Sequence, residues 1–375
     1  MREAELREAT RIVRSGLTAV KAGDPLHAGP AFVSTFYTPG NPGDAPYTYG
    51  RSHNPTWTEL ERAIGWLEGE GAGARIFGSG LAAIAAVFGA VLRPGDTVVL
   101  PGNAYFAARQ LLEEMFAPMG VRLRKAATER LGSAEALAGA KLVWLETPSN
   151  PSLEITDVRA VAEAAHRAGA LVAVDNTTAS PLAQKPLTLG ADFSVCSDSK
   201  AMCGHSDLLL GHVATLDREL LAKIDRERTL RGAIAGPMEA WLALRSLATL
   251  PLRLERSSAN ARAIAEFLQG RNEVAEVLYP GLQTHVGHEI AARQMSYFGP
   301  VLGFTLNGRE AAERFLGASK LVTEATSFGG VTTTAERRAR WGHDEIAPGF
   351  IRMSAGCEDA QDLIRDIGRA LDAIR

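Results

Sequence analysis

The stretch from Val174 to Asp207, VDNTTASPLAQKPLTLGADFSVCSDSKAMCGHSD, decides the fold of this chain. An apolar strand ends at Asp175, a short crossover follows, and a second strand runs into Lys200. Because successive parallel strands end at the same edge of a sheet, both side chains can reach one crevice there. Small and apolar residues surround Lys200, and desolvation in such a setting lowers the pKa of an amine. We therefore interpret Lys200 as an amine that condenses with a carbonyl group.

Length and composition limit what the rest of the chain can be. A chain of 375 residues exceeds one core and predicts about two domains. The net charge is −3 with both signs interspersed, which argues against a nucleic-acid partner. The three cysteines are odd in number and lack Cys-x-x-Cys spacing, which argues against a disulfide framework or a zinc site. The first residues contain no apolar signal core, and the longest apolar run, Leu81 to Leu92, is shorter than the ~20 residues of a membrane span. A cytoplasmic protein that does not enter a membrane is expected.

Three regions follow from the patterns along the chain. Residues 1–46 are rich in Gly and Pro, cannot build a core of their own, and are expected to contact a neighbouring subunit. Residues 47–236 alternate strand and helix patterns, which predicts an α/β domain with a parallel sheet. Residues 237–375 form a smaller α+β domain. Four further segments are expected: a helix over Ala104–Ala117, strands over Leu208–Thr215 and Leu321–Thr326, and a long helix from Pro237 that breaks at Pro251.

Two segments before residue 100 could bind an anion. Tyr49 and Arg51 either form an ordinary surface turn or clamp a phosphate, since a guanidinium matches phosphate geometry. Gly78-Ser79-Gly80 opens an apolar helix, whose first N–H groups and dipole can hold a phosphate. The same glycines fit the dinucleotide fingerprint, which offers a nicotinamide-dependent oxidoreductase as an alternative. The next strand ends in Pro101-Gly102-Asn103, without an acidic residue for a ribose, and this argues against that alternative.

Further candidates have a structural and a functional interpretation each. Tyr105 follows a strand end, where packing is the common role and ligand contact the alternative. Asn150 lies in Glu146-Thr-Pro-Ser-Asn-Pro151 and could cap a turn. Asp175 could cap the following turn or face a heterocyclic nitrogen. Arg352 lies mid-strand, where an arginine is usually an edge residue or a member of an ion pair. The basic run Ala335 to Gly342 is interpreted as a solvated face.

Several of these motifs together resemble one known family. Tyr49-x-Arg51 with Asn54-Pro-Thr56, the Glu146 to Pro151 string, the stretch from Val174 to Asp207, and Arg352-Met-Ser-Ala-Gly occur in the order of the Cys/Met-metabolism enzymes that depend on pyridoxal 5′-phosphate (PLP). The resemblance covers roughly Tyr47 to Leu371. It implies fold type I of the PLP-dependent transferases, as in aspartate aminotransferase, with a mostly parallel central sheet and a smaller α+β C-terminal domain.

The resemblance also assigns roles, all of them expectations here. Lys200 forms the Schiff base with PLP and is catalytic with Tyr105, which stacks on the pyridine ring. Asp175 faces the ring nitrogen. The remaining cofactor residues are the phosphate ligands Gly80, Leu81, Ser197 and Ser199, the residues Tyr49 and Arg51 that reach a neighbour's phosphate, and Asn150 at the phenolic oxygen. Arg352 binds the substrate carboxylate, with Ser327 and Asn150 in the same pocket.

The expected activity is that of a carbon–sulfur lyase of trans-sulfuration. The pattern is most similar to bacterial enzymes that cleave L-cystathionine by γ-elimination to L-cysteine, 2-oxobutyrate and ammonia. Cystathionine β-lyase, cystathionine γ-synthase and methionine γ-lyase activities stay open, as does a scaffold without chemistry. The chain departs from the family at three places: the segment Phe106-Ala-Ala108 replaces glycines, Ser199 replaces threonine, and Thr326 stands where eukaryotic γ-lyases have glutamate. The family further implies a homotetramer, a dimer of dimers with active sites shared between subunits.

Overall fold

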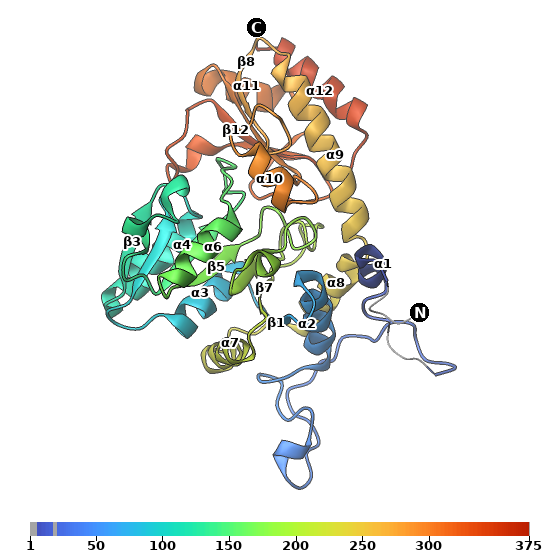
Figure 1. Ribbon diagram of the computed structural model, residues 1–375. Coiled ribbons are helices and arrows are strands. Elements are labelled where there is room, and N and C mark those ends of the chain that lie inside the picture. Colours follow the sequence, from blue (N-terminus) through green and yellow to red (C-terminus); the bar gives the residue numbers. More distant parts are fainter. Residues whose placement is uncertain (1–5, 18–20, 375) are drawn as a thin grey trace.

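A computed structural model of the protein describes residues 6–17 and 21–374. The chain forms two sheets, one in a large domain and one in a smaller domain built from the C-terminal part (Figure 1). None of the helices in the described ranges combines the length and the apolar character needed to cross a bilayer.

The large sheet has seven strands in the order β1-β7-β6-β5-β4-β2-β3. Strand β7 runs antiparallel to both of its neighbours, and the other pairs are parallel, which confirms the predicted mostly parallel sheet. The strands are β1 (Gly73–Phe77), β2 (Thr97–Pro101), β3 (Arg122–Ala126), β4 (Leu142–Glu146), β5 (Leu171–Asp175), β6 (Phe193–Cys196) and β7 (Gly211–Thr215).

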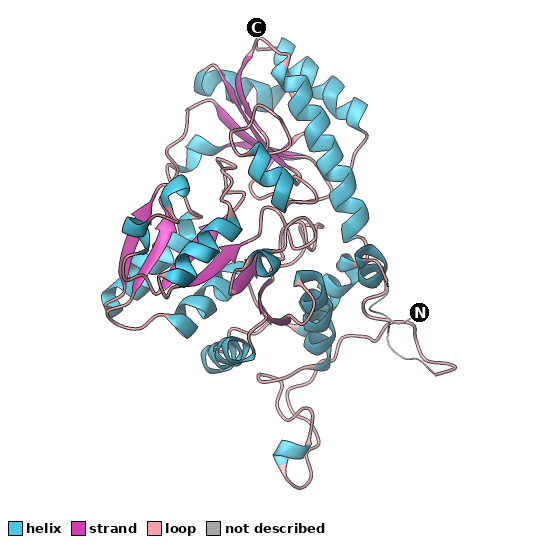
Figure 2. Cartoon of the chain, in the orientation of Figure 1, coloured by secondary structure: helices cyan, strands magenta, loops and turns pink. Residues whose placement is uncertain are grey.

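Helices cover both faces of this sheet (Figure 2). Side chains alternate along β2: Val98 and Leu100 pack with one group of helices, and Val99 packs with the other. The first group is α3 (Gly80–Val91), α4 (Phe106–Leu111) and α7 (Arg218–Arg231); the opposite face carries α2 (Pro55–Glu68), α5 (Ala134–Leu137), α6 (Val158–Arg167) and α8 (Pro237–Leu247). Strands buried on both faces explain the nearly continuous apolar runs in the sequence.

The smaller domain contains a five-stranded sheet in the order β10-β11-β12-β9-β8. Its strands are β8 (Val274–Leu278), β9 (Val301–Leu306), β10 (Thr323–Glu324), β11 (Thr334–Arg337) and β12 (Phe350–Ser354). Three helices share a core with it: α9 (Leu250–Gln269), α11 (Gly308–Ala318) and α12 (Ala360–Asp372). The short α10 (His288–Gln294) lies on the side that faces the large domain (Figure 1). A second, smaller α+β unit was expected, and this part of the fold prediction is confirmed.

Four expected segments were wrong in extent. The helix predicted over Ala104–Ala117 is α4 followed by a π-helical turn over Leu112–Phe116, and a 3-10 turn precedes Gly120. Strand β7 begins at Gly211, because the backbone of Leu210 bonds to a serine hydroxyl instead of a strand. Of the strand predicted over Leu321–Thr326, only the two exposed residues Thr323 and Glu324 form a strand, which pairs with β11 at the edge of the sheet. The long helix breaks at Ala248 and Thr249, and Pro251 lies in the first turn of α9, where its missing N–H costs nothing.

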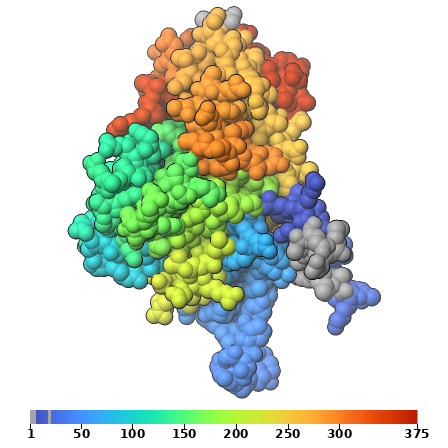
Figure 3. All heavy atoms as spheres, viewed as in Figure 1, coloured from blue at the N-terminus to red at the C-terminus, as the bar shows by residue number. Residues whose placement is uncertain are grey.

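The N-terminal region includes α1 (Glu8–Val13) and an extended arm, residues 21–53, which leads to α2 and contains a short 3-10 turn, η2 (Pro42–Asp44). The arm projects from the body of the molecule (Figure 3). It exposes aromatic side chains, with Phe32 at 70% and Tyr37 at 91%. Parts of the predicted extension, residues 1–5 and 18–20, lie outside the described residues.

Candidate active site

A cavity of about 410 Å³ lies at the carboxyl edge of the large sheet, against the smaller domain. Parallel strands end here, which is where ligands bind in such sheets. Nine of the residues that the sequence singled out line it: Gly80, Leu81, Tyr105, Asn150, Asp175, Ser197, Lys200, Ser327 and Arg352.

Lys200 follows β6 in a turn, with its backbone N–H donating to the carbonyl of Ser197 at 3.2 Å. Its ammonium nitrogen lies 5.5 Å from the centre of the Phe328 ring. Burial and then the charge of Arg352 lower the pKa of Lys200, while Asp175 opposes them. A lowered pKa increases the fraction of neutral amine, the form that attacks carbonyls and accepts protons.

Asp175 is the last residue of β5 and stands opposite Glu146 in the parallel pair with β4. Burial raises the pKa of both carboxyl groups, that of Glu146 to about 8, and the charge of Asp175 raises the pKa of Glu146 further. Hydrogen bonds from Thr177 and the charge of Lys200 partly offset the shift at Asp175. Glu146 accepts the backbone N–H groups of Tyr105 (2.5 Å) and Asn150 (2.8 Å). The sequence marked Glu146 only as part of the loop Glu146–Pro151, and this positioning role was not predicted from it.

The start of α3 forms a tight cradle for an anion. The helix begins at Gly80 after the N-cap Ser79, whose hydroxyl accepts the N–H of Ala82 at 3.1 Å. A Cβ added to Gly80 would lie 2.5 Å from the Cβ of Ser197, so a larger residue would displace Ser197. The backbone N–H of Ser197 donates to the Thr177 hydroxyl at 2.8 Å. Helix N–H groups, a hydroxyl and the absence of a side chain at Gly80 suit a phosphate.

Arg352 projects from β12, with 4% of its surface exposed. Its guanidinium donates to the side chain of Asn150 at 2.6 Å, to the carbonyl of Ser327 at 3.0 Å, and to the carboxylate of Glu336. Glu336 stands opposite Arg352 in the β11–β12 pair and is fully buried. Burial would raise the pKa of Glu336, but the Arg352 charge and other partners hold it below its usual value. A fixed, buried guanidinium is suited to a substrate carboxylate.

The basic run at Ala335–Gly342, predicted as a solvated face, is instead buried over residues 335–338 and contributes a wall of the cavity, while residues 340–342 are exposed as predicted. Arg338 is 7% exposed and lines the cavity together with Trp341 and His343. The His343 ring stacks on Phe106 with centroids 4.5 Å apart. Residues 335–338 are buried beside the β11–β12 pair, whereas Arg340 and Trp341 are exposed. The buried Arg338 has internal carboxylates as partners: it donates to Glu336 at 3.0 Å and to Asp344 at 2.7 Å. The sequence Thr334–Arg337 has no polar–apolar alternation, so it contained no signal for a strand.

Three predicted site residues lie elsewhere in this chain. Tyr49 is 48% exposed on the arm, and Arg51 donates to the carbonyl of Thr229 at 2.9 Å, away from the cavity. The Ser199 hydroxyl donates to the carbonyl of Leu210 at 3.2 Å and accepts its N–H at 2.9 Å. Ser199 therefore stabilises the loop in front of β7 in this structure.

The sequence of residues 10–372 matches the family described as Cys/Met metabolism PLP-dependent enzymes. The match spans almost the whole chain. The chain belongs to this family. Its cofactor is therefore PLP, and the resemblance seen in the sequence motifs is confirmed.

Individual relatives carry different names. A protein of Streptomyces coelicolor named a putative cystathionine γ-lyase is 52% identical over 368 residues, 97% of this chain and 93% of that protein. A structure of cystathionine γ-synthase from Xanthomonas oryzae pv. oryzae in complex with cystathionine superposes with a TM-score of 0.93, at 38% identity and 98% coverage of both chains. A structure described as a methionine γ-lyase, from Micromonospora echinospora, has a TM-score of 0.91 at 39% identity and covers 98% of this chain and 100% of that one.

The cavity fits PLP on its own chemistry. The cradle at Gly80 and Ser197 would hold the phosphate, and the buried Asp175 carboxylate would pair with a protonated ring nitrogen. Lys200, with its lowered pKa, would bind the aldehyde. The same cavity leaves Arg352 to bind an amino-acid carboxylate.

Proposed function

We propose that this protein is a carbon–sulfur lyase that cleaves L-cystathionine by γ-elimination to L-cysteine, 2-oxobutyrate and ammonia. The observation that carries the proposal is the 52% identity to the Streptomyces protein named a putative cystathionine γ-lyase, over 97% of this chain. The geometry supports it, since one cavity contains an amine of lowered pKa, a buried carboxylate and a buried guanidinium.

Each of these groups has a proposed task. Arg352 binds the α-carboxylate, in an orientation that Glu336 and Asn150 fix through hydrogen bonds. When bound, PLP supplies an electron-poor ring that accepts the electron pair left when the α-proton departs. Asp175 stabilises the proton on the ring nitrogen. Lys200 removes the α-proton through its Nζ atom.

Lys200 also decides between the two types of elimination. In γ-elimination its Nζ must carry a second proton, from the β-carbon, before the sulfur leaves the γ-carbon. In β-elimination the thiol leaves directly after the α-proton. The Lys200 ammonium lies beside the apolar Phe328 ring, 5.5 Å from its centre, and we propose that it moves between the two carbons along this surface.

Product analysis tests the proposal. Purified protein loaded with PLP is incubated with L-cystathionine, and the keto acid is identified. We expect 2-oxobutyrate with an equal amount of cysteine. Pyruvate with homocysteine would refute γ-elimination and assign β-lyase activity.

Cystathionine γ-synthase is the second candidate, because the Xanthomonas enzyme of that name superposes at a TM-score of 0.93. A synthase joins an acyl-homoserine to cysteine. Supplying both substrates and measuring cystathionine formation distinguishes the two activities, since a lyase consumes cystathionine instead. Methionine as sole substrate, with detection of methanethiol, tests the name given to the Micromonospora neighbour.

We further propose that the site is completed by a second copy of the chain, within a homotetramer. Tyr49 and Arg51 do not line the cavity of their own chain, and Tyr49 is 48% exposed, as expected of residues that serve a neighbour. Mixing an Arg51→Ala variant with a Lys200→Ala variant should restore about one quarter of wild-type activity, because half of the random dimers are mixed and each has one intact site. No recovery after subunit exchange would refute sharing.

A further inference from the structure

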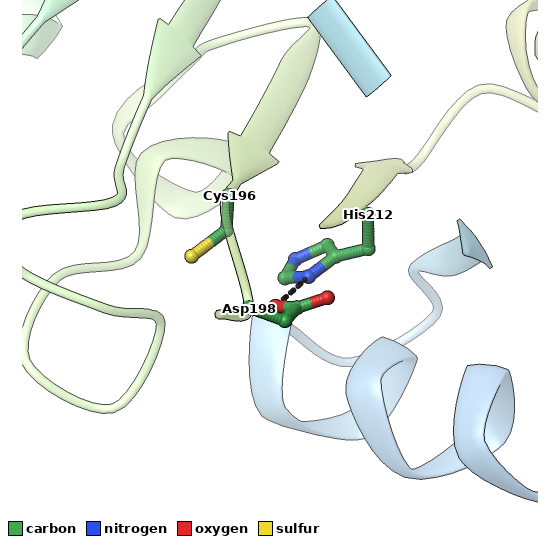
Figure 4. Close-up of side chains that lie close together, drawn as sticks. All are labelled: Cys196, Asp198 and His212. Carbon is green, nitrogen blue, oxygen red and sulfur yellow. Dashed lines mark hydrogen bonds and ion pairs between the residues drawn. The ribbon is translucent and has the colours of Figure 1, made fainter. Parts of the chain in front are cut away.

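A buried charged network lies behind the loop that carries Lys200. The His212 imidazole of β7 stands between two carboxylates: Nδ1 is 2.7 Å from Asp198, and Nε2 is 2.8 Å from Glu68, the last residue of α2. Figure 4 shows the Asp198–His212 contact. The imidazole and Glu68 are fully buried, and Asp198 is 1% exposed. The network therefore joins α2, β7 and the loop after β6 without contact with solvent.

The partners decide the charge of this histidine. Ionised carboxylates only accept hydrogen bonds, so both ring nitrogens carry a proton and the ring is an imidazolium. Burial alone would lower the pKa of His212, but the charges and hydrogen bonds of Asp198 and Glu68 raise it to about 10. The second oxygen of each carboxylate is buried without a hydrogen-bond partner among the described residues. The single positive charge of the imidazolium therefore faces both carboxylates, which share it as a hydrogen-bond donor.

The network connects directly to the proposed PLP site. Asp198 lies between Ser197 and Ser199, two residues before Lys200, and its carbonyl accepts the N–H of Cys203 at 3.0 Å. Gly211, the residue before His212, packs so closely on α3 that an added Cβ would lie 2.6 Å from the Cα of Gly80. His212 thus ties together the strand beneath the anion cradle and the loop that presents the amine.

A metal ion is the alternative occupant, because Cys196, Asp198 and His212 place ligand atoms within 4.8 Å of one another. Two observations argue against it. Both nitrogens of His212 already lie at hydrogen-bond distance from carboxylates. In Figure 4 the Cys196 sulfur points away from the Asp198–His212 pair. The arrangement is that of an ion-pair network.

We infer that His212 is a positioning residue, which holds Asp198 and so fixes Ser197 and Lys200 for the binding of PLP. This inference rests on the proposed roles of Ser197 and Lys200. Local sequence does not reveal it, because Glu68 and His212 are 144 residues apart.

Cofactor affinity tests the inference without reference to turnover. The apo-forms of wild type, His212→Gln and Asp198→Asn are titrated with PLP and with pyridoxamine 5′-phosphate, which lacks the aldehyde and so reports binding without the bond to Lys200. We expect Kd for PLP to rise at least about tenfold in both variants. Kd for pyridoxamine 5′-phosphate should rise less, by about threefold, because the bond to Lys200 does not contribute. Asp198→Asn keeps the side-chain volume and one acceptor oxygen, so it remains informative if His212→Gln fails to fold.

Ser194→Ala is the matched control, since its hydroxyl donates to Glu68 at 2.9 Å but lies outside the Lys200 loop. It should lower thermal stability and leave both Kd values unchanged. Folded Asp198→Asn protein with wild-type Kd values would overturn the inference. It would also be overturned if the wild-type protein contained one equivalent of zinc per chain and the His212→Gln variant contained none. Lys200→Ala separates the two levels of the argument: if it kept a visible band that borohydride removes, the proposed function would fail independently of Asp198.

Discussion

Glu336→Gln tests how the substrate guanidinium is held. The buried Glu336 carboxylate accepts hydrogen bonds from Arg352, from Arg338 (3.0 Å), from Arg340 (3.0 Å) and from the Trp341 indole (2.8 Å). The glutamine has nearly the same volume but no charge, and its amide nitrogen cannot accept. It leaves the guanidiniums of Arg352 and Arg338 buried without their shared counter-ion. Removing one partner of a buried pair costs about 3–5 kcal/mol.

Two measurements follow from this magnitude. The free energy of unfolding of the apo-protein, from denaturant titration at fixed protein concentration, should fall by about 3–5 kcal/mol. The kcat/KM for cystathionine should fall about 10²-fold, since a displaced guanidinium misplaces the substrate by an ångström or so.

Glu324→Gln provides the control. Glu324 bonds to Arg340 at 2.9 Å in the same cluster, but about half of its side chain is exposed. An exposed pair contributes at most about 1 kcal/mol, so stability and kcat/KM should stay near wild type. If Glu336→Gln behaved like Glu324→Gln in both measurements, the reasoning about the buried cluster would be refuted.

Three further predictions concern the cofactor side of the cavity and the effect of pH. Gly80→Ala should weaken PLP binding at least about tenfold in a titration of the apo-protein, because the added Cβ collides with Ser197; an unchanged Kd would contradict the cradle. Asp175→Asn should lower kcat about 10²- to 10³-fold with a smaller effect on PLP affinity, since the amide cannot compensate a ring charge; steady-state kinetics decide, and wild-type kcat would exclude the role. Stability of the apo-protein should fall as pH rises from 6.5 to 8, because the folded state keeps protons on His212 (pKa about 10, unfolded 6.5) and Glu146 (pKa about 8, unfolded 4.5) that the unfolded state releases. The denaturant concentration at the unfolding midpoint should therefore be lower at pH 8 than at pH 6.5. A higher midpoint at pH 8 would show that these pKa shifts are wrong.

Much of the fold was accessible from sequence because local patterns specify it. Apolar runs alternating with helical periods predicted a mostly parallel sheet, and the strand ends at Asp175 and Lys200 marked its ligand-binding edge. The start of α3 at Gly80 followed from the glycines before an apolar helix. Boundaries were less accurate where side chains compete with the backbone, as at Leu210, which bonds to the Ser199 hydroxyl.

The sequence did not predict the cavity wall formed by the basic run at Ala335–Gly342, for a different reason. A run of charges predicts exposure when each residue is considered alone. Arg338 and Glu336 are buried because they compensate each other and Arg352 across a pair of strands. Arg352, the partner of Glu336, lies 16 residues further along the chain, and no periodicity in the sequence predicts this pairing.

By itself the sequence determined the family, the order of strands and helices, and the residues at the ends of the central strands. These features depend on local spacing and on motifs, which a chain carries whether or not it is folded. Only the tertiary structure decided which charges face each other: Glu336 with Arg352, Glu146 with Asp175, and His212 between Glu68 and Asp198. Such contacts arise from strand register and helix packing, which bring distant residues within hydrogen-bond distance and exclude the water that would otherwise solvate them.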